Sequence, residues 1–414
     1  MKYVISGGNK LYGSIKIQGA KNSVLCLLAA SILSSGGVYV KNCPKICDVL
    51  CMISILKSMG ATVVEQDGGY YVNASNLTTL KIPEKLSNKV RASLFLVGAI
   101  LGKYKEVYIS RTGGCNIGLR PMDIHIDALI KLGATVEEKN GVLHFCATQL
   151  KGANIRLKYP SVGATENIIM SACLADGVTV IENCAKEPEI CDLANFINLM
   201  GGKVSGHGTS RITIIGVKKL AFAEFSPLPD RIETGTFMLL AAGCGGELEI
   251  KCTKWENICI LSEKLVNNSC KICLNNDIIY IQVNNRIKGF GQIETKPYPG
   301  FPTDLQPLLV SCASVARGKT VVKETVFESR FAYADELKKL GAKISYSGNL
   351  LQVEGGRLFG AKVYSPDLRG GAGLCLAGLC AEGQTIIENV STIERGYENF
   401  HKKLQLLGAK INKK

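Results

Sequence analysis

A short phrase that recurs six times constrains the fold of this chain more than any other feature. Five copies end a helix-like segment with glycine and continue into a strand-like run, as in Leu132-Gly-Ala-Thr-Val and Leu340-Gly-Ala-Lys-Ile. Glycine suits this place because it adopts the left-handed conformation that ends a helix. The sixth copy, Asn268-Ser-Cys-Lys-Ile, has lost the glycine. We call the glycine position of each copy, which is Ser269 in the sixth, its repeat mark. The repeat marks fall at 60, 133, 201, 269, 341 and 408, so the repeating unit is 67 to 73 residues long.

Each repeat also holds a second helix-like segment, rich in Ala, Leu, Gly and Ser and nearly free of charge. A helix that is apolar on all sides must be buried on all sides. We therefore expect an α/β fold in which each domain has three buried helices wrapped by sheets. The six segments are Val24–Ile32, Ala92–Leu101, Asn167–Ala175, Thr236–Cys244, Leu305–Ala316 and Gly371–Ala381.

A chain of 414 residues is expected to form two domains. The segment Phe225–Arg231 contains two prolines after the third repeat and is typical of a linker. Residues 1–19 have a strand pattern but no partner among the first three repeats. The sequence thus predicts a first domain of residues 20–229 and a second of residues 1–19 plus 230–414. We expect the active site in the cleft between them.

Polar residues stand at the start of all six buried segments. A helix N-terminus offers free N–H groups and a partial positive charge, which together bind anions. We expect these six starts to share one cleft, although each residue taken singly is better explained as a helix cap or a solvated end. The residues concerned are Lys21-Asn22, Arg91, Ser161-Val-Gly-Ala-Thr165, Asp230-Arg231, Thr303-Asp304 and Asp367-Leu-Arg369.

The second repeat is about five residues longer than the others, and the excess lies in a glycine-rich loop around Cys115. Arg111 and Arg120 flank this cysteine, and Pro121 is suited to open the following helix. Neighbouring cations and a helix start are expected to lower the pKa of the thiol and make it reactive. An insertion into one repeat also predicts a functional loop or lid.

The other cysteines suggest a reducing environment rather than a metal site. There are 17, an odd number, mostly within apolar runs, which is typical of buried thiols in a cytosolic protein. Cys270 and Cys273 form a C-x-x-C without a second pair or a nearby histidine. A zinc site needs about four ligands, so we expect two core thiols there, and no metal or cofactor.

The net charge of +14 leaves nucleic acid, an anionic membrane and anionic small molecules as partners. The lysines are spread from end to end and there is one Trp, so a basic nucleic-acid-binding repeat protein remains only as an alternative. No signal peptide and no apolar run long enough to span a bilayer is found, which predicts a cytoplasmic protein.

Several motifs, in order along the whole chain, carry a resemblance to a known family. They are Gly-Ala-Lys21-Asn, Gly-Gly-Cys115-Asn-Ile-Gly-Leu-Arg120-Pro, Ser161-Val-Gly-Ala-Thr-Glu-Asn167, Pro229-Asp-Arg-Ile-Glu-Thr-Gly235, Phe301-Pro-Thr-Asp304, Glu328-Ser-Arg330-Phe and Asp367-Leu-Arg369. Together they resemble the UDP-N-acetylglucosamine 1-carboxyvinyltransferases of the enolpyruvyl transferase family. The resemblance implies two inside-out α/β domains, each of three repeated units.

The resemblance also implies a reaction. The enolpyruvyl group of phosphoenolpyruvate would pass to the 3-hydroxyl of UDP-N-acetylglucosamine, by addition to a tetrahedral phospholactoyl species and then elimination of phosphate. This reaction opens peptidoglycan synthesis, on which the cell wall, cell shape and cell division depend, and it is the target of the epoxide fosfomycin. The expected partners are the two small substrates, with no nucleic acid, membrane or obligate protein partner. A relative acting on shikimate 3-phosphate shares the architecture, but the cysteine loop argues against it.

The family's site residues carry over onto matching positions. Cys115 would protonate the methylene carbon of phosphoenolpyruvate and form an adduct with it, and Asp304 would take the proton of the sugar hydroxyl or orient it. Lys21, Arg120 and Arg395 would hold phosphoenolpyruvate. Further substrate contacts are expected from Asn22, Arg91, Pro121, Met122, Asp123, Ile124, Ser161, Val162, Gly163 and Val326. A supporting role is expected for Arg330, Asp367, Arg369 and His125.

Overall fold

The computed structural model of the chain describes residues 1–110, 113, 117–118 and 121–414. The described residues fall into two domains. The first domain comprises residues 19–110, 113 and 121–228, and the second comprises residues 1–18, 117–118 and 229–414. Both boundaries therefore lie one residue before the predicted positions.

The chain passes between the domains along two short stretches that are each tied by backbone hydrogen bonds. In the first domain Ala20 N–H donates to the carbonyl of Leu228 at 2.8 Å, and in the second Asp230 N–H donates to the carbonyl of Gln18 at 2.9 Å. The residues on either side of both boundaries are thus anchored within their own domain.

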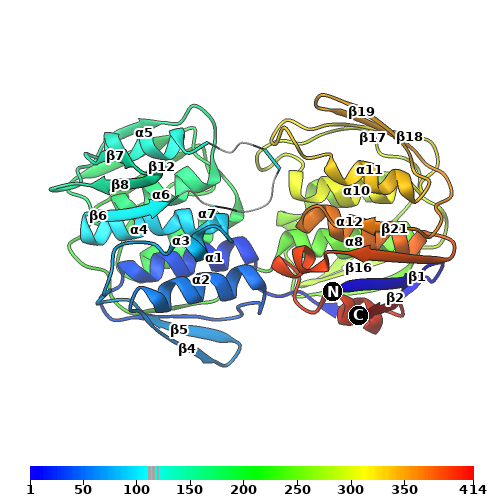
Figure 1. Cartoon of the computed structure of the whole chain (residues 1–414), viewed down its shortest axis with the longest axis horizontal. Helices are drawn as coiled ribbons and strands as arrows, with labels where there is room; N and C mark the ends of the chain where they lie inside the picture. The colour runs from blue at the N-terminus through cyan, green and yellow to red at the C-terminus, as the bar shows by residue number, and fades with distance from the viewer. Residues whose placement is uncertain (111–112, 114–116, 119–120) are drawn as a thin grey trace. The chain divides into compact units, whose positions relative to one another are not determined.

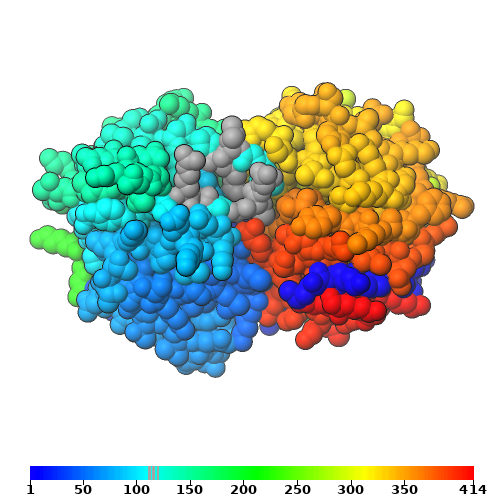
Figure 2. Space-filling model, in the orientation of Figure 1, coloured from blue at the N-terminus to red at the C-terminus, as the bar shows by residue number. Residues whose placement is uncertain are grey.

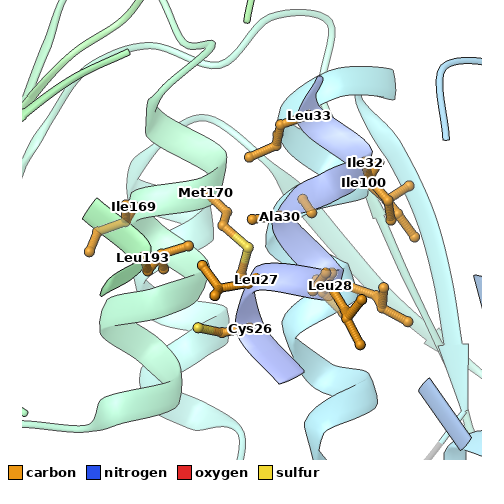
Figure 3. Packing of buried hydrophobic residues seen from close by; sticks show 14 of the residues in the cluster. Cys26, Leu27, Leu28, Ala30, Ile32, Leu33, Ile100, Ile169, Met170 and Leu193 are labelled. Atoms are coloured by element: carbon orange, nitrogen blue, oxygen red, sulfur yellow. The ribbon is translucent and has the colours of Figure 1, made fainter. Parts of the chain in front are cut away.

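Three helices fill the interior of the first domain. They are α1 (Lys21–Ala30), α4 (Phe95–Tyr104) and α6 (Val162–Ala172). Nine of the ten α1 residues are buried, and those from Val24 to Ala30 are all buried, as the lack of charge in that stretch predicts. In Figure 3, Leu27 of α1 points toward Met170 of α6, and Ile32, just beyond α1, lies beside Ile100 of α4. Small residues permit this packing, since a Cβ on Gly98 would lie 2.7 Å from the Cα of Asn167.

The sheets that surround these helices repeat one pattern. In the orders β13-β3-β5-β4 and β9-β10-β12-β11, an edge strand runs parallel to the next strand, which pairs antiparallel with a hairpin. The order β6-β8-β7 is extended by a parallel bridge between Lys81 and Tyr108. The strands are β3 (Val38–Val40), β4 (Thr62–Gln66), β5 (Gly69–Asn73), β6 (Glu106–Ser110), β7 (Thr135–Lys139), β8 (Val142–Cys146), β9 (Asn154–Arg156), β10 (Val178–Glu182), β11 (Lys203–Ser205), β12 (Arg211–Ile215) and β13 (Ala223–Phe225).

The second domain repeats this arrangement around α8 (Arg231–Cys244), α10 (Gln306–Ala313) and α12 (Leu368–Cys380). All eight residues of α10 are buried. The sheet orders are β2-β14-β16-β15, β17-β18-β20-β19 and β21-β22-β1-β23. The strands are β1 (Lys2–Ser6), β2 (Leu11–Lys16), β14 (Gly246–Lys251), β15 (Lys271–Asn275), β16 (Ile278–Val283), β17 (Gly291–Glu294), β18 (Lys319–Lys323), β19 (Lys343–Ser347), β20 (Leu350–Glu354), β21 (Lys362–Tyr364), β22 (Gln384–Glu388) and β23 (Lys410–Lys413).

The N-terminal strands complete two sheets of the second domain. β1 lies between β22 and β23 and pairs antiparallel with both, while β2 pairs parallel with β14. Figures 1 and 2 show the blue N-terminal residues beside the red C-terminal ones. In this sheet β1 takes the place that the second hairpin strand has in the other sheets.

Outer helices connect the central strands to the hairpins. They are α2 (Cys47–Ser58), α5 (Asp123–Lys131), α7 (Pro188–Leu199), α9 (Cys259–Asn267), α11 (Ala332–Lys339) and α13 (Phe400–Leu406), and a short helix α3 (Glu84–Ser87) precedes the second buried segment. The predicted helix ends have the expected left-handed backbone, with φ between 88° and 100° at the five glycines. Ser269 adopts the same conformation, with φ of 78°, although it has a side chain.

The layout of apolar helices inside and sheets outside confirms the predicted fold class. One detail of the cysteine prediction is wrong: Cys270 is buried, but Cys273 is exposed on the outer side of β15. Within the described residues no cluster of His, Cys, Asp and Glu could hold a metal ion, and no helix there is long and apolar enough to cross a membrane.

Candidate active site

The predicted reactive loop is only partly described. Cys115, Arg120 and Arg111 lie outside the described residues. Of its neighbours, Gly113 N–H donates to the carbonyl of Ser87 at 3.1 Å in the first domain. In the second domain the carbonyl of Ile117 accepts from Ser329 N–H at 3.1 Å.

Asp304 is held by two buried arginines in the second domain. Its Oδ1 lies 3.1 Å from Nη2 of Arg330, and its Oδ2 lies 3.2 Å from Nε of Arg369. The arginine side chains are 2% and 3% exposed, whereas the Asp304 side chain is 30% exposed. The two buried guanidinium groups therefore fix the position of the carboxylate, while part of the Asp304 side chain stays open to solvent.

This arrangement corrects the expected local role of Asp304. The residue lies within a 3₁₀ turn at Thr303–Leu305, directly before α10, and the capping position is taken by Pro302. Its side chain makes ion pairs instead of capping a helix. Since ion pairs between a carboxylate and guanidinium groups are strong and directional, the turn presents Asp304 in a defined orientation.

Two other polar residues at helix starts, Asp367 and Asp230, cap their helices, which is the explanation that the sequence favours for each residue taken singly. The Oδ1 of Asp367 accepts from the N–H groups of Arg369 and Gly370, at 2.9 and 3.1 Å, and Asp230 caps α8 in the same way. Asp367 also lies 3.7 Å from Nη1 of Arg330. Arg330, Asp367 and Arg369, for which a supporting role is expected, thus form a charge network with Asp304.

In the first domain, Lys21 is the first residue of α1 and is buried. Its Nζ lies 2.7 Å from Oδ2 of Asp48 on α2. Asn22 follows on the same turn and is exposed. The start of α1 therefore presents one exposed amide beside a cation whose position is set by a buried carboxylate.

His125 is buried on α5 and neither caps a helix nor faces solvent. Its Nδ1 lies 2.9 Å from Nδ2 of Asn167, whose Oδ1 in turn accepts from Gly98 N–H at 2.6 Å. Burial, followed by the charge of Arg91, lowers the pKa of His125 to about 4 against the opposing charge of Asp123. A neutral histidine therefore joins α5, α6 and α4.

Two of the segments expected to contact substrate, residues 121–124 and 161–163, lie at the starts of α5 and α6, and His125 connects these helices. A Cβ on Gly163 would lie 3.0 Å from Cε1 of His125, so the backbone of α6 approaches the ring closely. The Oγ of Ser161 caps α6 by accepting from Ala164 N–H at 3.3 Å. Pro121 and Asp123 are exposed, and Arg91, Met122, Ile124, Ser161, Val162 and Gly163 are half-buried.

Glu324 is a residue of the site region that the sequence did not single out. It follows β18, is 3% exposed, and its Oε1 accepts from Val326 N–H at 2.8 Å. The same carboxylate accepts from the hydroxyls of Thr295 and Thr303, at 2.8 and 2.9 Å. One buried carboxylate thus fixes both the segment of Val326 and the turn of Asp304. The sequence signal that could have identified Glu324 is an acidic residue directly after the alternating strand β18.

Arg395 ends a 3₁₀ segment at Val390–Arg395 and is half-buried. Two residues further on, the ring of Tyr397 lies 5.0 Å from the guanidinium carbon of Arg369. The segment that carries Arg395 is therefore linked to the Asp304 network through Tyr397.

A family model supports a common origin with known enzymes. The model of EPSP synthase (3-phosphoshikimate 1-carboxyvinyltransferase) matches residues 5–404. Curated relatives include UDP-N-acetylglucosamine 1-carboxyvinyltransferase 2 of Caldanaerobacter subterraneus subsp. tengcongensis, 46% identical over 99% of both chains. The UDP-N-acetylglucosamine 1-carboxyvinyltransferase of Clostridium botulinum is 41% identical, also over 99% of both chains.

Solved structures share the fold. The enolpyruvyl transferase NikO from Streptomyces tendae matches with a TM-score of 0.90 at 23% identity, covering 99% of this chain and 98% of that one. EPSP synthase from Acinetobacter baumannii matches with a TM-score of 0.76 at 19% identity, covering 99% of each chain. At this level of identity the likeness concerns the fold alone.

Proposed function

The chain belongs to the enolpyruvyl transferase family of EPSP synthase, and from that premise we propose that it transfers the enolpyruvyl group of phosphoenolpyruvate to the 3-hydroxyl of UDP-N-acetylglucosamine. The full-length relatives named for this activity support the choice of acceptor. The structural observation that carries the proposal is Asp304, open to solvent and fixed by Arg330 and Arg369. We place the reaction in the cytoplasm, as the first committed step of peptidoglycan synthesis.

In the proposed mechanism, Asp304 orients the sugar hydroxyl and accepts its proton. A bond forms from the hydroxyl oxygen to C2 of phosphoenolpyruvate while C3 gains a proton, which gives a tetrahedral phospholactoyl species. Elimination then breaks the bond from C2 to the phosphate oxygen and removes a proton from C3. Because two guanidinium groups already neutralise the carboxylate of Asp304, its main contribution is orientation.

The cations of the proposed site are Lys21, Arg120 and Arg395, which we assign to the carboxylate and phosphate of phosphoenolpyruvate. Lys21 supports this assignment because it is the first residue of the buried helix α1. Its ammonium group and the free N–H groups of the helix start both favour an anion. We assign to Cys115 the protonation of C3. The starts of α5 and α6 would bind the uridine and diphosphate through the residues expected from the sequence.

Phosphate release from phosphoenolpyruvate tests the proposal, with either UDP-N-acetylglucosamine or shikimate 3-phosphate as acceptor. We expect turnover with the nucleotide sugar and none with shikimate 3-phosphate. Turnover with shikimate 3-phosphate alone would assign the chain to the other branch of the family, and no turnover with either would refute enolpyruvyl transfer.

Variants of the cysteine loop test the mechanism. Cys115→Ser should lower kcat by about 100-fold or more, because serine is a far weaker acid. Cys115→Asp should retain turnover, since a carboxyl group can also donate a proton. An epoxide analogue of phosphoenolpyruvate should alkylate Cys115, whereas the exposed Cys273 serves as the control thiol. Alkylation of a different cysteine as the inactivating event would contradict the role of this loop.

A further inference from the structure

Three cysteines occupy equivalent places in the three repeats of the second domain. Cys244 ends α8, Cys312 lies one residue before the end of α10, and Cys380 ends α12. They are spaced 68 residues apart along the chain. Since the three helices pack together, equivalent positions meet at their C-terminal ends, and the Sγ atoms of Cys244 and Cys380 lie 3.6 Å apart.

The two helices approach each other closely at this point. A Cβ on Gly243 would lie 2.8 Å from Cδ2 of Leu376 and 3.4 Å from Sγ of Cys380. A disulfide needs its sulfur atoms about 2.05 Å apart, so the present separation must close by about 1.5 Å. Closing this gap requires the two side chains to rotate about χ1.

The surroundings distinguish this pair from the third thiol. Cys244 and Cys380 are partly exposed, whereas Cys312 is buried. The hydrogen bond with Cys380 raises the pKa of Cys244, and burial raises it further. A protonated thiol reacts slowly, which slows the reaction of Cys244 with an oxidant.

We propose that Cys244 and Cys380 are an oxidation site at which a peroxide converts the two thiols into a disulfide that joins α8 to α12. The thiolate of one cysteine attacks the peroxide, forming an S–O bond and breaking the O–O bond, and the departing hydroxide leaves as water after taking a proton. The second thiol then attacks that sulfur, an S–S bond forms, the S–O bond breaks, and a second water leaves. The thiols lose two electrons and the peroxide gains them.

The site is independent of the proposed transfer reaction. The pair lies at the C-terminal ends of α8 and α12, and the caps Asp230 and Asp367 lie at the opposite ends. Helices of 13 and 14 residues place these ends about 20 Å apart. A disulfide here would cross-link residues far apart in sequence, and thereby stabilise the second domain without touching Asp304.

Mass spectrometry of the full chain tests the proposal. The reduced protein is treated with hydrogen peroxide, its remaining thiols are alkylated, and it is digested without reductant. We expect a peptide pair joined through Cys244 and Cys380. We also expect the melting temperature to rise by about 5–10 °C, and the rise to vanish on adding dithiothreitol.

Matched variants exclude other pairings. Cys312→Ser should still give the cross-link and the rise in melting temperature, whereas Cys244→Ser and Cys380→Ser should give neither. Because the cross-link is measured first in the unaltered chain, a variant that folds poorly leaves the test intact. A cross-link from Cys312 to either thiol, or no cross-link while Cys244 and Cys380 oxidise singly, would overturn the proposal.

Discussion

Asp48 fixes the position of Lys21, with 2.7 Å between the carboxylate oxygen Oδ2 and the ammonium nitrogen. The Lys21 side chain is 10% exposed and the Asp48 side chain is 7% exposed, so both charges are shielded from bulk water. A buried ion pair stabilises little as a whole, but removal of one partner leaves the other charge uncompensated. The cation proposed to bind phosphoenolpyruvate therefore depends on a carboxylate that carries no chemistry of its own.

The first prediction concerns this pair. Asp48→Asn should lower the free energy of unfolding by about 3 kcal/mol, as measured by urea denaturation. The matched control is Glu224→Gln, which breaks the surface pair with Lys41, where both side chains are about half exposed. That change should cost less than about 0.5 kcal/mol. Equal losses in the two variants would contradict the importance of burial.

The second prediction concerns the repeat mark that lacks glycine. Ser269 is exposed and has φ of 78°, a conformation that is strained for a residue with a side chain. Ser269→Gly should therefore stabilise the second domain by about 1 kcal/mol. The reciprocal change, Gly201→Ser, should destabilise the first domain by a similar amount, since Gly201 has φ of 96° and open space around it. Thermal unfolding of both variants measures these effects, and a destabilised Ser269→Gly would refute the explanation.

A third prediction follows from the burial of His125. Its pKa is lowered from 6.5 to about 4, so between these pH values the unfolded chain binds a proton that the folded chain does not. Stability should fall as the pH drops through this window, by about 3 kcal/mol at most from this group. His125→Gln removes the titration, and the difference in unfolding free energy between variant and parent should shift in favour of the variant from pH 7 to pH 4.5. A difference that stays constant with pH would contradict the prediction.

Glu166 leads to the opposite pH dependence. It lies on α6, is 1% exposed, and its Oε2 has no hydrogen-bond partner among the described residues. Burial raises the pKa of Glu166 well above 4.5, and the charges of Glu189 and Glu187 raise it further. The unfolded carboxyl thus ionises before the folded one, and stability is lost as the pH rises above 4.5.

The fourth prediction is that Glu166→Gln stabilises the chain, and more at pH 8 than at pH 5. Glutamine keeps the shape of the protonated side chain and removes the cost of keeping it neutral. Chemical denaturation at the two pH values measures the effect. A larger gain at pH 5 than at pH 8 would show that Glu166 is ionised in the fold.

The fifth prediction concerns the carboxylate that the sequence did not single out. Glu324→Gln should weaken the bonds to Val326, Thr295 and Thr303, and thereby loosen the turn of Asp304. We expect kcat for enolpyruvyl transfer to fall by about tenfold and the KM for the nucleotide sugar to rise. Glu354→Gln, on the exposed side of β20, is the control. Kinetics indistinguishable from those of the control would assign Glu324 a structural role only.

The fold was predictable from the sequence because each repeat carries its own local signals. The uncharged segments indicate buried helices, and the glycine at each repeat mark indicates a helix end. The inner helices were therefore predicted correctly, although their first residues were not. α6 begins at Val162 rather than Asn167, since polar residues belong to its first turn. The partner of Lys21 was not predictable, because Asp48 is on a different helix and no local pattern distinguishes a buried carboxylate from an exposed one. The pairing of His125 with Asn167 depends in the same way on helices that meet only in the folded chain.

The position of β1 sets an order of events during synthesis. The partners of this first strand are β22 and β23, the last strands of the chain, and Lys2 exchanges backbone hydrogen bonds with Lys414 at 2.8 and 2.9 Å. β1 must therefore stay unpaired until β22 and β23 have been translated. The first domain can close meanwhile, since the strands of its sheets all come from its own residues. A nascent chain stalled after residue 260 should show a protease-resistant first domain behind an accessible leading segment.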